Sequence, residues 1–82
     1  MIEAAGSVTD VVAAEVVIAV NGAKRSIPAG STLADLLESL ALDARTVVIE
    51  RNGTILRDRG SFATVELASD DALEIVHFVG GG

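Results

Sequence analysis

The sequence contains no cysteine, tryptophan or tyrosine, and only one histidine and two phenylalanines among its 82 residues. Without cysteine, a disulfide scaffold, a thiolate metal site and a cysteine nucleophile are all excluded. One histidine cannot form the histidine cluster of a zinc site. Hydrophobic residues still make up 50% of the chain, so it can fold around a core of valine, leucine and isoleucine.

Positive charge is also scarce, with 6 Lys and Arg against 12 Asp and Glu and a net charge of -6. Such a chain repels phosphate backbones and anionic lipid, so we expect neither nucleic acid nor a membrane as a partner. No run reaches the roughly 18 apolar residues of a spanning helix. No Lys or Arg precedes Lys24, as a secretory signal would require. We therefore expect a cytoplasmic protein with one small domain.

The chain divides into three parts. Residues 1–14 are small and weakly patterned, which indicates an N-terminal extension outside the core. Residues 15–79 carry the regular hydrophobic patterns of a folded domain. Residues 80–82 are a glycine tail, which we expect to be flexible because glycine loses the most conformational entropy on ordering.

The folded part begins with a predicted hairpin and a helix. Residues 15–20 and 23–27 read as strands around Asn21-Gly22, two residues that tolerate the positive φ of a tight hairpin turn. Thr32 is a good N-cap, and Asp35 adds negative charge to the first helical turn. The apolar stripe of the helix has the spacing i, i+3, i+4 and i+7, and its members are Leu33, Leu36, Leu37 and Leu40.

Further strands follow the helix. Residues 46–50 and 72–79 read as strands, 54–56 and 65–67 as short ones, and 57–64 as a charged connection anchored by Phe62. The helix can bury its leucines only against one face of a sheet, with the other face uncovered. We therefore predict an α+β fold, with a mixed four- to five-stranded sheet and one main helix packed on one face.

The folded part offers no convincing catalytic centre. Only His77 could act as a base near neutral pH, and a histidine at a strand end is more often partly buried or at an interface. Asp70 and Asp71 follow Ser69 and read as a solvated turn. No phosphate-binding loop, dinucleotide fingerprint or zinc-protease motif is present.

The unusual feature is the ending, Phe78-Val79-Gly80-Gly81-Gly82. One interpretation is a frayed end or an added linker. The other makes the Gly82 carboxylate the reactive group, which ATP converts to an acyl-adenylate that sulfur or nitrogen can attack. Residues without Cβ can thread the narrowest channel of a partner and adopt any backbone conformation. The folded domain would then be a rigid support that presents the flexible glycine tail to the partner.

Four segments together resemble the ThiS family of sulfur carrier proteins, which have the ubiquitin-like β-grasp fold. They are 20–22 (VNG), 28–37 (PAGSTLADLL), 48–53 (VIERNG) and 74–82 (EIVHFVGGG). The resemblance covers residues 16–82, and its last two segments are the specific ones. Residues 1–14 depart from it, because family members usually begin close to the first strand.

The resemblance implies a carrier that is a protein substrate, not an enzyme, and that binds no cofactor itself. A ThiF-like adenylyltransferase would use ATP to adenylate Gly82. A persulfide derived from a cysteine desulfurase would displace AMP and leave a thiocarboxylate on Gly82. A ThiG-like thiazole synthase would take this sulfur into the thiazole of thiamine. Gly80, Gly81 and Gly82 would thread the active sites of these partners.

Alternation along the last strand places Val76 and Phe78 on the face opposite the helix, so we expect Val76, Phe78 and Val79 to help dock the partners. Glu74 could meet Arg or Lys on a partner. Other interpretations remain open at this stage. They are a molybdopterin synthase small subunit, a protein-conjugating modifier, a stand-alone β-grasp interaction module with an inert tail, and a small enzyme that uses His77.

Overall fold

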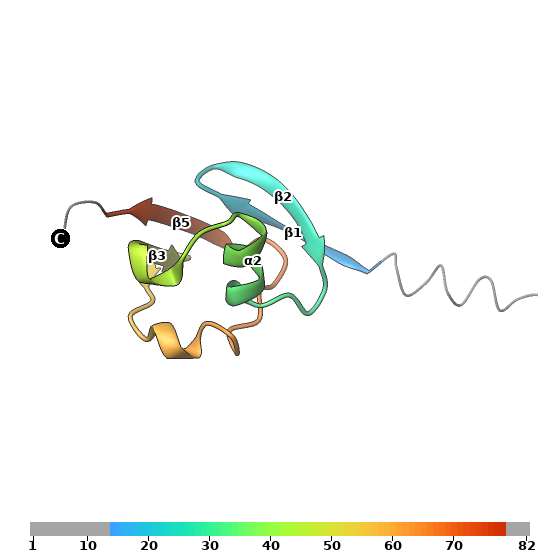
Figure 1. The fold of residues 1–82 in the computed structure, drawn as a ribbon. Coiled ribbons are helices and arrows are strands. Elements are labelled where there is room, and N and C mark those ends of the chain that lie inside the picture. The colour runs from blue at the N-terminus through green and yellow to red at the C-terminus, as the bar shows by residue number, and fades with distance from the viewer. Residues whose placement is uncertain (1–13, 79–82) are drawn as a thin grey trace, which may run out of the picture.

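The computed structural model describes residues 14–78, which form one sheet and one α-helix with two short 3-10 helices (Figure 1). The elements in chain order are β1 (Glu15–Val20), β2 (Ala23–Pro28), α2 (Leu33–Ser39), η1 (Ala44–Thr46), β3 (Val47–Arg51), β4 (Thr54–Ile55), η2 (Arg59–Ser61) and β5 (Ala72–His77). No helix in this part of the chain is long and apolar enough to cross a membrane.

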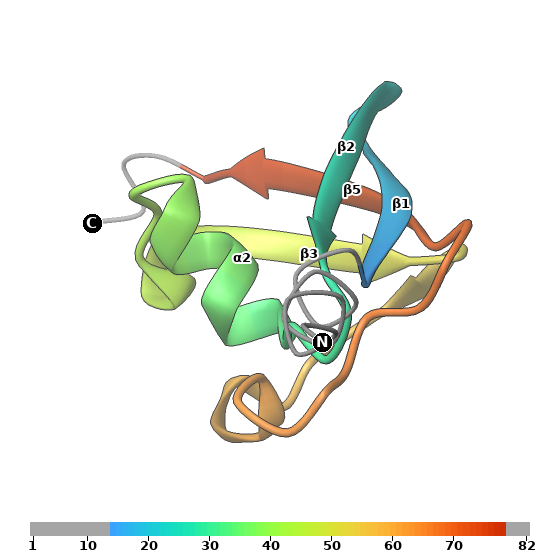
Figure 2. The same ribbon diagram turned by 90° about the vertical axis from the view of Figure 1, so that its right-hand side faces the viewer.

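The five strands form one mixed sheet in the order β2-β1-β5-β3-β4. β5 is central, parallel to β1 and antiparallel to β3. Figure 2 shows α2 on one side of the sheet, and the β1–β2 hairpin steeply inclined to β5 and β3, as sheet twist requires. The predicted α+β architecture is confirmed, with five strands and one covered face.

The first hairpin forms at Asn21-Gly22, as predicted. Both residues have positive φ, 51° and 87°, which is the requirement of a two-residue primed turn. The β1–β2 register runs from Glu15 opposite Pro28 to Val20 opposite Ala23.

Helix α2 has the predicted cap but is shorter than its leucine spacing indicates. Thr32 and Asp35 form a capping box, in which each side chain accepts a hydrogen bond from the other residue's backbone N–H. The helix ends because Ala41 adopts a positive φ of 59°. The Leu42 N–H then donates to the Leu37 carbonyl and the Ala41 N–H to the Glu38 carbonyl, which is a Schellman motif.

One core lies between α2 and the sheet. Leu36, which is 2% exposed, belongs to a cluster that also includes Ile18 on β1, Ile49 on β3 and Leu73 on β5. Among residues 14–78 the buried hydrophobic residues are Ile18, Ile27, Leu33, Leu36, Leu37, Val47, Ile49, Phe62, Leu67, Leu73 and Ile75. Val16 on β1 is partly buried against this cluster.

The connection between β4 and β5 is where the structure departs most from the sequence patterns. Residues 59–61 form η2, and the predicted strand at 65–67 is reduced to one bridge between Thr32 and Glu66. Phe62 is 3% exposed and anchors this connection to the core, as expected. β5 ends at His77; Val79, placed in this strand by the sequence, lies outside the described residues.

Candidate functional site

The candidate site is the end of β5, from which the glycine tail follows in sequence. Val76 and Phe78 lie in the described part of the chain. Val79, Gly80, Gly81 and Gly82 lie outside it, as do residues 1–13 of the predicted extension. The structure therefore defines the base from which the tail starts and the surface around that base.

The base is held on both sides, because β5 pairs with β1 and with β3. Leu73 and Ile75 point into the core and are 0% and 8% exposed. Asn21 extends the contact with β1 beyond the end of that strand. Its Nδ2 donates to the Ile75 carbonyl at 3.1 Å, and its Oδ1 accepts from the Ile75 N–H at 2.7 Å. This side chain therefore takes the place of a strand residue, a role that its turn signal does not reveal.

The start of β5 is fixed by a buried carboxylate, that of Asp71, which is 6% exposed. Arg51 donates to its Oδ2 from Nε at 3.0 Å and Nη2 at 2.8 Å. The Ala68 N–H also donates to Oδ2, and Asn52 Nδ2 donates to Oδ1. The expected solvated turn is thus wrong for Asp71, although Asp70 is exposed. Asp71 turns inward because three neighbours supply donors.

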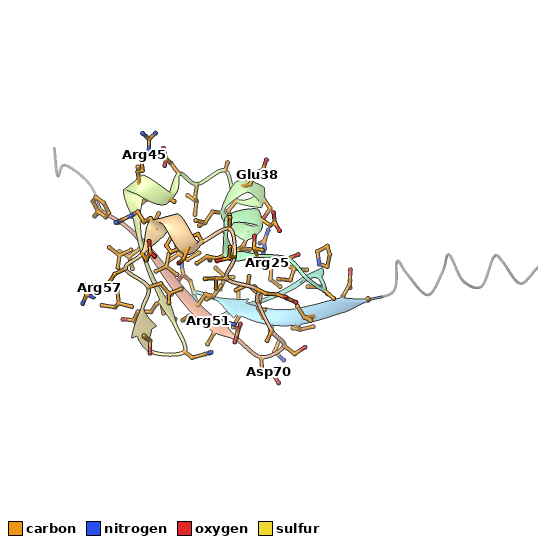
Figure 3. The ribbon with its side chains drawn as sticks, turned by 90° about the horizontal axis from the view of Figure 1, so that it is seen from below. Arg25, Glu38, Arg45, Arg51, Arg57 and Asp70 are labelled. Atoms are coloured by element: carbon orange, nitrogen blue, oxygen red, sulfur yellow. The ribbon has the colours of Figure 1, made fainter. Side chains whose placement is uncertain are left out.

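These contacts control the pKa of Asp71. Burial alone would raise the pKa, because it removes water from the charged form. Hydrogen bonds from Ala68 and Asn52, and the hydrogen bonds and charge of Arg51, outweigh burial and bring the pKa below its usual value. Figure 3 shows Arg51 over the sheet, whereas Arg45 and Asp70 project outward at different ends of the domain. The positive charge of Arg51 therefore balances the negative charge of the buried Asp71 carboxylate.

At the end of β5 the chain contacts η1 and η2. His77, opposite Val47, is exposed. The Phe78 N–H donates to the Thr46 carbonyl at 3.1 Å. The Phe78 ring is 45% exposed, and its centroid lies 5.9 Å from the guanidinium carbon of Arg59. The Phe78 ring therefore faces the side chain of Arg59, the first residue of η2, a contact that strand alternation does not predict.

The sheet face opposite α2 carries several exposed apolar side chains. Val76 is 59% exposed, its cross-strand partner Val48 is 39% exposed, and Ile55 on β4 is 40% exposed. Glu50 and Glu74 lie directly opposite each other on this face, although like charges in such pairs destabilise a sheet. We call these five residues the docking face. Sequence alternation identified Val76 and Glu74, but not the residues that β3 and β4 place beside them.

The described residues offer little for catalysis. Within 14–78 no group of three or more His, Cys, Asp or Glu side chains is arranged to hold a metal ion. Every buried side-chain nitrogen or oxygen in this range has a hydrogen-bond partner, so none is left to receive a ligand. Within residues 14–78, the end of β5 presents a base anchored in the sheet and a partly apolar surface.

A five-stranded sheet with one covering helix has the architecture of a small ubiquitin-like domain, and a glycine ending follows its central strand in the sequence. A family model described as "ThiS family" matches residues 12–82. The chain therefore belongs to the ThiS family, and the predicted resemblance is confirmed.

The curated relatives are named as a sulfur carrier protein or as thiazole synthases. The Bacillus subtilis sulfur carrier protein ThiS is 47% identical over 51 residues, which are 62% of this chain and 76% of that protein. Thiazole synthases of Magnetococcus marinus and Paramagnetospirillum magneticum are each 42% identical over 65 residues, or 79% of this chain. The match spans only 20% of either synthase.

A solved structure supports the fold assignment. The crystal structure of a thiamine biosynthesis protein (ThiS) from Geobacter metallireducens has a TM-score of 0.67 and 29% identity to this chain. The alignment covers 80% of this chain and 99% of that one. The predicted β-grasp fold is confirmed.

Proposed function

We propose that this protein is a sulfur carrier whose Gly82 carboxylate is converted to a thiocarboxylate that supplies sulfur for the thiazole of thiamine. The observation that carries the proposal is the family match over residues 12–82, a range that includes the glycine ending. The 47% identical relative is named a sulfur carrier protein. The protein is a co-substrate and carrier in this scheme, not the catalyst.

The chemistry proceeds in two stages at one carbon. A ThiF-like adenylyltransferase joins the Gly82 carboxylate to the α-phosphate of ATP, and pyrophosphate leaves. The terminal sulfur of a persulfide, delivered from a cysteine desulfurase, then attacks the acyl carbon, and AMP leaves. A thiol that cleaves the resulting sulfur–sulfur bond frees the thiocarboxylate. This chain supplies the carboxylate, while ATP and the catalytic groups belong to the partners.

In this scheme the partners bind the folded domain and take the glycine tail into their active sites. Gly80, Gly81 and Gly82 have no side chains, so they can pass through a narrow active site. Val76 provides apolar docking area, which Phe78 and Val79 extend toward the tail. The unfavourable pairing of Glu50 with Glu74 is relieved when an Arg or Lys of the partner lies between them.

The thiazole synthase relatives favour a ThiG-like partner over the molybdopterin alternative. In those proteins a sequence similar to this chain forms a fifth of a polypeptide that is named a thiazole synthase. Joining two partners in one chain raises their effective concentration. We place both partners with this carrier in the cytoplasm, where thiols stay reduced.

Intact-mass measurement tests the proposal. The full chain is incubated with ATP, a ThiF-like adenylyltransferase and a persulfide source. We expect the mass to rise by the difference between sulfur and oxygen, and fragmentation to place the change on Gly82. Omission of ATP is the control. No mass change in the complete mixture, or a change elsewhere in the chain, would contradict the proposal.

The inert-tail alternative makes a different prediction. If the domain acts only as an interaction module, deletion of Gly81 and Gly82 leaves its function intact. If the domain is a carrier, the deletion abolishes sulfur transfer without affecting the fold.

A further inference from the structure

Arg59 is held in place by the backbone, although it lies on the surface. Its Nε donates to the Ala44 carbonyl at 2.8 Å, and its Nη2 donates to the Val47 carbonyl at 3.0 Å. Ala44 is the first residue of η1, and Val47 is the first residue of β3, which follows η1 directly. Two hydrogen bonds from one planar guanidinium fix both its position and its orientation.

Phe78 is attached to the same short stretch. Its N–H donates to the carbonyl of Thr46, which lies between Ala44 and Val47. Its ring centroid is 5.9 Å from Arg59 Cζ, within the range of a cation–π contact. The Phe78 backbone and the Arg59 guanidinium are thus both hydrogen-bonded to residues 44–47, and the Phe78 ring lies beside the guanidinium.

We propose that Arg59 is a positioning residue that acts through Phe78 to set the direction in which the C-terminal tail leaves the domain. The inference rests on the proposed function, because direction matters only if the end of the chain must enter a partner's active site. Residues 79–82 span at most about 14 Å when extended. Three of them are glycines, so they have no side chains to guide them.

A fixed origin restricts the volume that the end of a short tail explores. It therefore raises the concentration of the Gly82 carboxylate at the reaction centre of a docked partner. Loss of the Arg59–Phe78 contact leaves the docking face unchanged and makes productive entry less frequent. The effect is expected in kcat for the carrier substrate, whereas loss of docking contacts raises KM.

Two variants break the contact from opposite sides. Arg59→Gln removes the charge and the fork of donors. Phe78→Leu removes the aromatic face but keeps an apolar side chain and every backbone hydrogen bond of Arg59. Arg57→Gln is the matched control, because it removes the same charge from an exposed position two residues away. Within residues 14–78 the Arg57 side chain makes no hydrogen bond, in contrast to the two that Arg59 makes.

The assay is ATP–pyrophosphate exchange by a ThiF-like adenylyltransferase, measured against the concentration of the full-length carrier. We expect each single variant to lower kcat about two- to fivefold, the scale of an exposed cation–π contact. KM should stay unchanged in Arg59→Gln, whereas Phe78→Leu should also raise KM, because Phe78 extends the apolar docking area. The double variant should be no slower than either single variant, because both act through one contact. Arg57→Gln should behave like the unaltered chain.

Thermal unfolding separates positioning from support of the fold. Arg59→Gln should lower the unfolding midpoint in the Phe78→Leu variant as well as in the unaltered chain, because it loses the two carbonyl bonds in both cases. Its effect on kcat should disappear in the Phe78→Leu variant. An effect on kcat that persists there would overturn the inference, as would a change in KM alone for Arg59→Gln or an equal effect of Arg57→Gln.

The outcome also separates this inference from the proposed function. If the unaltered chain supports no exchange and gains no sulfur, the carrier role fails. If the unaltered chain reacts and Arg59→Gln reacts at the same rate, only the positioning role fails.

Discussion

Replacement of Asp71 by asparagine should remove a large part of the stability of the domain. The Asp71 carboxylate accepts four hydrogen bonds, three at Oδ2 and one at Oδ1. An amide of the same shape has one oxygen, so at least one of these buried donors loses its acceptor, and Arg51 loses its counter-charge. Hydrogen bonds to charged groups contribute about 1.5–3 kcal/mol each. We therefore expect Asp71→Asn to cost about 2–3 kcal/mol, against a total of about 3–5 kcal/mol for a core of this size.

Urea unfolding followed by circular dichroism measures this loss. Asp70→Asn is the control, because Asp70 is adjacent, exposed and has a positive φ of 72°, which asparagine tolerates. We expect the control to differ from the unaltered chain by less than about 0.5 kcal/mol. Equal effects of the two substitutions would refute the reasoning that burial and Arg51 make Asp71 important.

The pH dependence gives a second check. The folded pKa of Asp71 lies below its unfolded value, so its contribution is fully present above the unfolded pKa, about 3.9. That contribution falls as the pH drops through the lowered folded pKa, where the carboxyl group gains a proton. The stability difference between the unaltered chain and Asp71→Asn should therefore shrink in acid. A difference that stayed constant across this range would show that the charge of Asp71 is not what stabilises the fold.

Three further substitutions and one deletion test other parts of the structure. Leu36→Ala should cost about 2–5 kcal/mol, measured by urea unfolding; a small loss would mean that α2 is not packed as described. Ala41→Gly should stabilise the domain by up to about 1 kcal/mol, because glycine adopts the positive φ of the helix end without strain, and a lower thermal midpoint would contradict this. Val76→Asp should raise KM for the adenylyltransferase while leaving the unfolding midpoint unchanged, since Val76 is 59% exposed; an unaltered KM would remove it from the docking face. Deletion of Gly82 should abolish thiocarboxylate formation without changing stability, as mass spectrometry and thermal unfolding would report.

Local signals in the sequence were sufficient to predict much of the fold. Asn21-Gly22 identified the hairpin turn, because few residue pairs accept two consecutive positive φ values. Thr32 and Asp35 identified the start of α2, because their spacing suits a helix cap. The period of two in 72–77 identified the buried face of β5, where Leu73 and Ile75 lie. These features depend on residues that are close together in the chain.

The contacts missed by the sequence patterns join distant residues. Arg51 reaches Asp71 across 20 positions, and Arg59 reaches Ala44 across 15. No periodicity encodes such pairs, so Asp71 was predicted to be solvated. The end of α2 was missed for a different reason, because alanine is a poor marker of a left-handed residue. The neighbours of Val76 were missed because their identity depends on strand order.

The central place of β5 has a consequence for repeated use of the molecule. A strand at the margin of a sheet can peel away after losing one row of hydrogen bonds. β5 can detach only by giving up its rows with both β1 and β3 and by bringing Leu73 and Ile75 into water. Such an opening approaches the free energy of global unfolding. Amide hydrogens of β5 should therefore be among the slowest to exchange with solvent. An enzyme that binds and releases the end of the chain would thus act on the segment that is most firmly anchored in the domain.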